Sequence, residues 1–237
     1  AEARRVSASS GELYFPEDGR TQVGDGGEAV NDILPCGGDA LLFTSRAAMR
    51  MTFSKSRTPA LSPAADGVGI ALRGAAAGYP GGAVGACDGG IFVFNGAGAA
   101  ERLPDRAARD YAVGVTSAAY CRGADEVWLC APDDSRGRLL VFNTASRSIS
   151  FFTDIFADRI LSANGRMCFT RGCSLYTFDT ALIYDTEPDG TGTRRTLVTG
   201  SIDSPFFDFD YPAKRKRLHS ARPDIRGGNA VISAVAD

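Results

Sequence analysis

The sequence predicts an all-β fold, organised as a degenerate β-propeller-like array of about four to five blades of short strands. Three observations support this prediction. Apolar and aromatic runs of roughly three to six residues recur along the chain, a length that suits strands and is too short for helices. Gly, Asp and Asn, the residues of tight turns, separate these runs. No apolar stripe at helical spacing is sustained over several turns.

The apolar runs define the expected strands in chain order. They are Glu12–Phe15, Asp39–Thr44, Ala48–Phe53, Ile91–Phe94, Glu126–Cys130, Arg138–Asn143, Ser148–Phe152, Met167–Phe169 and Leu175–Phe178. Asn95-Gly96 directly follows one of them, and Asn-Gly after an apolar run is a strong hairpin signal. The segment from Asp105 to Tyr111 has room for two helical turns at most. The Gly-rich segment 78–85 lacks the phosphate-binding patterns, so we expect a loop between blades there.

Four segments share one order: a turn, an apolar strand, a short turn and a second strand. Their turns lie near Gly38, Gly89, Ala124 and Asn164. Gaps of roughly 35 to 50 residues between such turns suit a four-stranded propeller blade. The signatures of WD40, kelch and sialidase propellers are absent, so the predicted propeller is a degenerate one. A β-sandwich or a stack of hairpins is the alternative architecture.

The composition changes near residue 185 and predicts two domains, a propeller-like domain at 1–195 and a C-terminal β-module at 196–237. Residues 185–195 are rich in Asp, Gly and Thr and are expected to form an exposed loop. Ser204–Tyr211 alternates Phe and Asp, as a half-buried strand does. The sequence stops soon after the expected strand Val231–Val235. Because one strand cannot pair its own edges, we expect this module to be truncated.

Charge and cysteine content exclude several classes of function. The 26 basic and 28 acidic residues give a net charge of −2, which argues against a globally basic nucleic-acid binder. No window approaches the roughly 18 apolar residues of a membrane-spanning helix, and we expect no membrane association. Six cysteines match no zinc-site spacing and are expected to be mostly buried thiols. In an oxidising environment, Cys168 and Cys173 are the best candidates for a disulfide, since a hairpin centred on Thr170-Arg171 would place them opposite each other.

The densest positive charge lies near the C-terminus. It comprises Lys214, Arg215, Lys216 and Arg217, with Arg222 and Arg226. These residues are candidates for contact with DNA phosphates or a partner protein; equally, the charges suit an edge strand that resists pairing with other strands. No aromatic residue interleaves the basic ones, as a single-strand binding platform would require.

No residue pattern predicts catalysis, a metal site or a cofactor. The single histidine, His219, excludes mechanisms that need two imidazoles within one chain, and no partner motif accompanies it. Pairs of carboxylates are frequent, as glycosidases require, but such pairs are also common in turns and strands. These pairs are Asp105/Asp110, Asp133/Asp134 and Asp208/Asp210.

Three pieces of the chain carry a family resemblance. Ser10–Gly19 leads into Asp32–Ser45, Asp88–Gly96 is followed by Glu101–Asp105, and an aromatic and acidic strand precedes a basic one within Phe206–Leu218. In these pieces the chain resembles the tail-hub and nozzle-type structural proteins of tailed bacteriophages, which include the packaged-DNA stabilisation proteins. The resemblance implies a virion protein that forms a homo-oligomeric ring, joins other tail or portal-type proteins and helps retain or pass double-stranded DNA. It implies no catalytic residue.

Two other functions remain open on this sequence. A carbohydrate- or protein-binding propeller would carry a central pocket lined by aromatic and carboxylate side chains. A propeller hydrolase would need a convergent pair of carboxylates with separated pKa values in a cleft.

Overall fold

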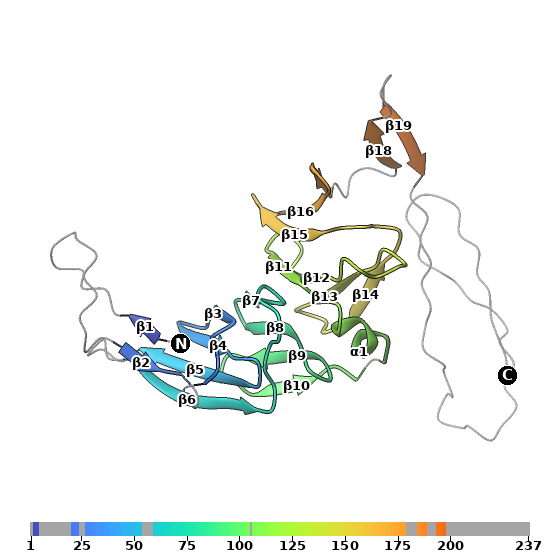
Figure 1. Ribbon diagram of the computed structural model, residues 1–237. Helices are drawn as coiled ribbons and strands as arrows, with labels where there is room; N and C mark the ends of the chain where they lie inside the picture. Colours follow the sequence, from blue (N-terminus) through green and yellow to red (C-terminus); the bar gives the residue numbers. More distant parts are fainter. Residues whose placement is uncertain are drawn as a thin grey trace, which may run out of the picture. The chain divides into compact units, whose positions relative to one another are not determined.

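A computed structural model (Figure 1) describes residues 2–4, 20–23, 27–53, 59–104, 106–178, 184–188 and 193–197. The chain divides into two units, residues 1–198 and residues 199–237. The second unit, which contains most of the predicted C-terminal β-module and its basic run, lies outside the described residues. The expected strand Glu12–Phe15 also lies outside them.

Four small antiparallel sheets make up most of the described structure (Figure 1). Each is a meander in which consecutive strands pair. The first sheet contains β3 (Asp32–Cys36), β4 (Asp39–Phe43), β5 (Ala47–Phe53) and β6 (Pro59–Asp66). The second contains β7 (Ala76–Tyr79), β8 (Gly82–Cys87), β9 (Gly90–Asn95) and β10 (Ala100–Arg102). The third contains β11 (Ser117–Cys121), β12 (Glu126–Cys130), β13 (Leu139–Asn143) and β14 (Ile149–Phe152), and the fourth β15 (Arg159–Ala163), β16 (Arg166–Arg171) and β17 (Ser174–Thr177).

The remaining elements are short. A helix, α1 (Arg106–Ala112), precedes the third sheet, where the sequence predicts at most two helical turns. One two-stranded sheet pairs β1 (Glu2–Arg4) with β2 (Arg20–Gln22). Another pairs β18 (Tyr184–Pro188) with β19 (Thr193–Leu197). The expectation of an exposed loop at 185–195 is therefore wrong: residues 185–188 and 193–195 lie in two paired strands, which Thr and charged residues largely make up.

The first strands of successive sheets lie against one another, because β3 contacts β7, β7 contacts β11 and β11 contacts β15. This order of meanders, each entered through its first strand, is that of propeller blades. The predicted all-β fold of small stacked sheets is confirmed. The turns between first and second strands follow Cys36, Tyr79, Cys121 and Ala163, about 40 residues apart as in propeller repeats. The predicted repeat was less regular because Asp88-Gly89 joins the second and third strands of its sheet.

The Gly-rich segment 78–85 is not a loop: it forms the end of β7, a tight turn and the first half of β8. All of β8 is buried. A Cβ atom on Gly85 would lie 2.9 Å from the Ala76 Cβ and 3.2 Å from the Ile70 Cδ1. Close packing at this position therefore requires a small residue. For this reason β8 is rich in Gly and Ala, a composition that in a sequence resembles a loop.

Of three apolar cores in the described residues, two join neighbouring sheets, and the third packs Val23 against the first sheet around Leu42 and Met51. The larger core joins the first three sheets, and within it Phe43 and Phe94 meet edge to face with ring centroids 4.9 Å apart. The smaller core joins the third sheet to the fourth around Trp128 and Met167. Successive residues of β12 point to opposite faces of the sheet, so Val127 and Leu129 enter the larger core while Trp128 and Cys130 enter the smaller one.

The expected placement of Cys168 opposite Cys173 across a hairpin is wrong. The hairpin turns at Gly172-Cys173, so Cys168 lies opposite Thr177 and its Sγ is 3.6 Å from the Thr177 Oγ1. All six cysteines are free thiols, and only Cys173 is exposed. Burial raises the pKa of Cys87 and Cys130 to about 12, which keeps these thiols protonated and unreactive. Within the described residues, no helix is long and apolar enough to cross a membrane.

Candidate ligand-binding site

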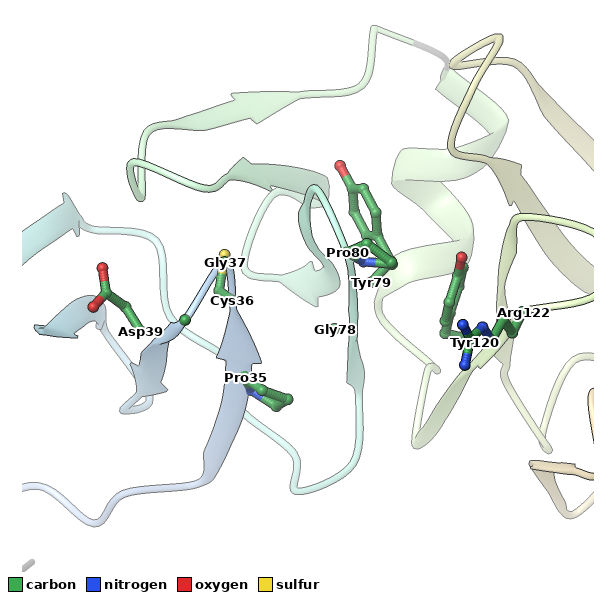
Figure 2. Close-up of a pocket in the computed structure, with 10 residues that line it drawn as sticks. Pro35, Cys36, Gly37, Asp39, Gly78, Tyr79, Pro80, Tyr120 and Arg122 are labelled. Carbon is green, nitrogen blue, oxygen red and sulfur yellow. The ribbon is translucent and has the colours of Figure 1, made fainter. Parts of the chain in front are cut away.

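An open depression of about 610 Å³ lies where the first turns of the first three sheets meet (Figure 2). We call this surface the turn-face depression. Ligand sites of small molecules typically have volumes of about 300–1,000 Å³. Three consecutive sheets contribute its lining, which consists of Pro35, Cys36, Gly37, Gly38, Asp39, Gly78, Tyr79, Pro80, Tyr120 and Arg122.

Tight turns give the depression its form. Cys36 pairs with Asp39 across a two-residue turn in which Gly37 and Gly38 have φ of 59° and 93°. Both angles are positive, as in a type I′ hairpin turn, and glycine accepts them without strain. Neither glycine carries a side chain, so the turn leaves space above it. The first turn of the second sheet is likewise a two-residue turn, Pro80-Gly81.

Two tyrosines are the large side chains of the depression. The ring centroids of Tyr79 and Tyr120 are 6.3 Å apart, and the rings are tilted by 44°. Both hydroxyl groups point in the same direction in Figure 2. The Tyr120 hydroxyl donates a hydrogen bond of 2.7 Å to the Asp125 Oδ1, and this bond is the main cause that raises the pKa of Tyr120. Burial raises the pKa of Tyr79. Both phenols are therefore neutral at physiological pH.

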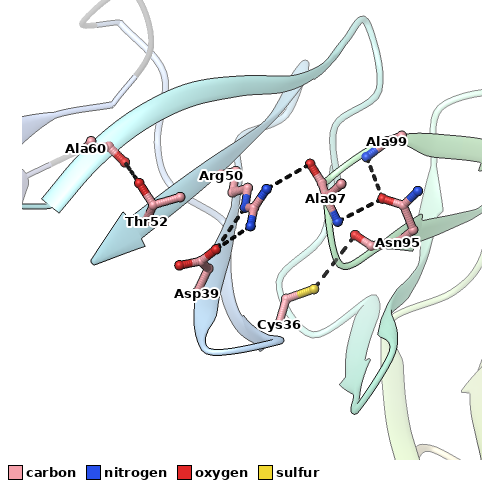
Figure 3. A network of polar contacts seen from close by, with 8 residues as sticks. All are labelled: Cys36, Asp39, Arg50, Thr52, Ala60, Asn95, Ala97 and Ala99. Carbon is pink, nitrogen blue, oxygen red and sulfur yellow. Dashed lines mark hydrogen bonds and ion pairs between the residues drawn. The ribbon is translucent and has the colours of Figure 1, made fainter. Parts of the chain in front are cut away.

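The one carboxylate that lines the depression is held in a structural ion pair (Figure 3). The Arg50 guanidinium donates to the Asp39 Oδ2 through Nε at 3.0 Å and Nη2 at 2.5 Å. Its Nη1 lies 3.5 Å from the Ala97 carbonyl oxygen in the turn after β9. Asn95 holds the same turn, because its Oδ1 accepts hydrogen bonds of 3.0 Å from the backbone N–H groups of Ala97 and Ala99. Arg50 therefore links the first sheet to the second, and Asp39 holds its guanidinium in place.

The lining favours binding by contact and hydrogen bonding. Burial is the main cause that raises the pKa of Cys36, whose thiol lies 3.8 Å from the Asn95 carbonyl oxygen, so this cysteine is a poor nucleophile. Asp39 has no second carboxylate beside it in the lining, as glycoside hydrolysis by a carboxylate pair would require. No group of three or more potential metal ligands occurs in the part of the chain that the structure describes.

The structure places few of the site residues considered from the sequence. Lys214, Arg215, Lys216, Arg217, Arg222 and Arg226 lie outside the described residues, as do His219, Asp105, Asp208 and Asp210. Sequence reasoning missed Tyr79, Tyr120 and Arg122. All three lie at the first turns of their sheets, so a repeat aligned on these turns would have brought them together.

The carboxylates of Asp133 and Asp134 do not form a catalytic pair. Asp133 is exposed, whereas the Asp134 Oδ2 accepts hydrogen bonds from Arg138 Nε at 2.7 Å and from the Arg138 backbone N–H at 3.1 Å. The Arg138 guanidinium also lies over the rings of Tyr111 and Phe151, at 5.5 and 5.3 Å. Burial alone would raise the pKa of Asp134, but the hydrogen bonds from Arg138 and Arg136 outweigh it and lower that pKa.

We expect Asp134→Asn to lower the free energy of unfolding by about 2 kcal/mol at pH 7, because a largely buried guanidinium loses its charged partner. The folded-state pKa of Asp134 lies below its ordinary value of 3.8. Its ionised form therefore contributes stability above that value, and the contribution is lost as the pH falls through the lowered folded-state pKa. Urea denaturation between pH 7 and pH 2.5 should show the difference between wild type and Asp134→Asn shrinking at the acidic end. The exposed neighbour provides the control, since Asp133→Asn should change little at any pH; a constant Asp134→Asn deficit would contradict the assignment.

Comparisons with known proteins show no family for this chain. No protein-family model matches it, and no curated protein matches it. Among solved structures, the extracellular domain of the hybrid two-component system BT4673 from B. thetaiotaomicron aligns with a TM-score of 0.47 at 13% identity, over 77% of this chain and 23% of that one. PorZ, a surface component of the type IX secretion system of Porphyromonas gingivalis, aligns with a TM-score of 0.29 at 12% identity, over 75% of this chain and 27% of that one. The chain thus covers about a quarter of each of these chains. The resemblance to phage tail proteins stays a prediction.

Proposed function

We propose that this chain is a carbohydrate-binding module on a β-propeller-like scaffold and that it holds its ligand in the turn-face depression. The observation that carries this proposal is the convergence of Tyr79 and Tyr120 from neighbouring sheets into one open site. A binding propeller is expected to carry a central pocket lined by aromatic and carboxylate side chains, and this depression contains both kinds of side chain. The ring-forming virion protein implied by the sequence resemblance remains a prediction.

A sugar suits this lining because a pyranose ring has two kinds of surface. Its C–H groups form an apolar face, and an aromatic ring with a negative face attracts such polarised hydrogens. Its hydroxyl groups need hydrogen-bonding partners, which the Tyr79 and Tyr120 phenols and the exposed backbone of Gly37 and Gly38 offer.

The chain is proposed to bind its sugar without cleaving it. Catalysis by two carboxylates requires a separate acid and base on either side of the scissile bond. In the depression, the single lining carboxylate, Asp39, is neutralised by Arg50. The arrangement therefore favours a ligand that is held and released unchanged.

The test is binding of the full chain to an array of immobilised neutral and acidic oligosaccharides, followed by calorimetry on those that bind. We expect Tyr79→Ala and Tyr120→Ala each to weaken binding about tenfold, because each removes an aromatic contact of about 1–1.5 kcal/mol. Tyr79→Phe should retain most of the affinity, since it keeps the ring.

Tyr176→Ala is the matched control, because Tyr176 stacks on Phe169 in the fourth sheet and does not line the depression. Thermal melting should show each variant folded at the assay temperature. The proposal is overturned if no oligosaccharide on the array binds, or if both depression variants bind as tightly as the wild type.

A further inference from the structure

The charged side chains in and around the turn-face depression differ in whether they already have a bonding partner. Asp39 is paired with Arg50, and Asp125 accepts the hydrogen bond from the Tyr120 hydroxyl. Arg147, whose charge acts on Tyr79, is paired with Glu101 at 2.6 Å. Arg122, by contrast, is exposed, lines the depression and makes no ion pair with any residue that the structure describes. Asp125 keeps its negative charge but does not line the depression, so Arg122 is the lining charged group that a ligand can pair with.

A second unpaired arginine lies at the adjoining turn of the fourth sheet. The Cys121 thiol approaches the Gly165 carbonyl oxygen at 3.4 Å, and a Cβ atom on Gly123 would lie 2.8 Å from that same oxygen. The first turns of the third and fourth sheets are thus in direct contact. Arg166 directly follows Gly165, is exposed and likewise forms no ion pair within the described ranges. The two arginines flank this contact, one from each turn.

We propose that the turn-face depression selects acidic saccharides, with the carboxylate of a uronic acid on the Arg122 guanidinium and the sugar ring against Tyr79 or Tyr120. This inference rests on the proposed carbohydrate-binding function and names its ligand class. A guanidinium presents a planar set of donors that matches the two oxygens of a carboxylate. Arg166, at the adjoining turn, offers a second guanidinium to a longer acidic chain.

The experiment compares uronic-acid oligosaccharides with the neutral sugars obtained by reducing their carboxyl groups. Oligogalacturonides, hyaluronan fragments and alginate fragments serve as probes, each beside its carboxyl-reduced form. We expect the wild type to bind at least one acidic probe about tenfold or more tightly than its reduced form, which corresponds to one charge-assisted bidentate contact.

Arg122→Gln should lose this preference while its affinity for the reduced probe stays unchanged, and Arg122→Lys should recover part of it. Arg166→Gln should weaken only the longer acidic probes. Arg106→Gln is the matched control, because Arg106 is an exposed arginine on α1 that does not line the depression. Because these side chains are exposed, the variants should melt close to the wild type.

The outcomes distinguish failure of the acidic preference from failure of the proposed carbohydrate-binding function. Equal binding of acidic and reduced probes overturns the acidic preference and leaves carbohydrate binding in place, as does a preference that survives in Arg122→Gln. A preference lost equally in Arg106→Gln would assign it to the general charge of the protein and overturn the role of Arg122. Failure of every saccharide, neutral or acidic, overturns the proposed function and this inference together.

Discussion

Phe94→Ala is expected to lower the free energy of unfolding by about 4 kcal/mol. The Phe94 side chain is 0% exposed and lies edge to face against Phe43 in the core that joins the first three sheets. Alanine removes most of the buried ring surface and leaves a cavity, because the closely packed sheets cannot fully collapse into it. Urea denaturation followed by circular dichroism measures the loss as a lower midpoint with an unchanged slope.

Val113→Ala is the control for this experiment. Val113 follows α1 and is 86% exposed, so its truncation should change the unfolding free energy by less than about 0.5 kcal/mol. A Phe94→Ala loss below about 1 kcal/mol would mean that the site is solvated or repacks freely. That result would contradict a single core shared by three sheets.

Gly82→Ala is expected to cost about 3 kcal/mol or more, which is large for the addition of one methyl group. The new Cβ would lie 1.8 Å from the carbonyl oxygen of Phe94. That oxygen belongs to β9, the strand paired with β8, and Gly82 is opposite Asn95 in the register. Because the colliding atom is backbone, the hairpin must open locally to relieve the contact. Thermal unfolding should show a clearly lower midpoint for this variant.

Gly89→Ala separates steric collision from backbone strain. Gly89 lies in the next turn of the same sheet with φ of 88°, and its Cβ would meet nothing within 4 Å. Alanine there carries only the cost of a left-handed conformation, about 1–2 kcal/mol. Gly82→Ala should therefore be the more damaging of the two. Equal losses would show that the close approach of β8 to β9 does not limit this position.

The sequence predicted the strands whose residues prefer extended structure and missed those defined by close packing. The run Glu126–Cys130 coincides with β12, and Ile91–Phe94 lies within β9. In contrast, β7 and β8 consist mainly of Ala and Gly. These residues have a low strand preference, so the sequence alone indicates a loop when the packing partners of the strands are unknown. The outer strand β6 contains two prolines, Pro59 and Pro63. Proline cannot donate a backbone hydrogen bond, so a segment that contains it is not predicted as a strand from sequence alone.

The candidate site was less accessible to sequence reasoning than the fold. Tyr79, Tyr120 and Arg122 are separated along the chain and meet only because first strands of neighbouring sheets lie side by side. The absence of an ion-pair partner for Arg122 within the described residues is likewise a property of the folded chain. The basic run at 214–217 is easier to find in a sequence, because its charged residues are consecutive.

Two separate apolar cores join neighbouring sheets, and this division allows the sheets to unfold in separate steps along the chain. The first three sheets share one core, whereas the described contacts of the fourth sheet run to the third through the smaller core. Opening of the fourth sheet breaks one interface and leaves the larger core intact, so it requires less free energy than global unfolding. Backbone amides of β15, β16 and β17 would then exchange with solvent through a local event, before those of β4, β8 and β12. The third sheet contributes one face of β12 to each of these two cores. It therefore forms the border between the part that opens locally and the part that unfolds globally.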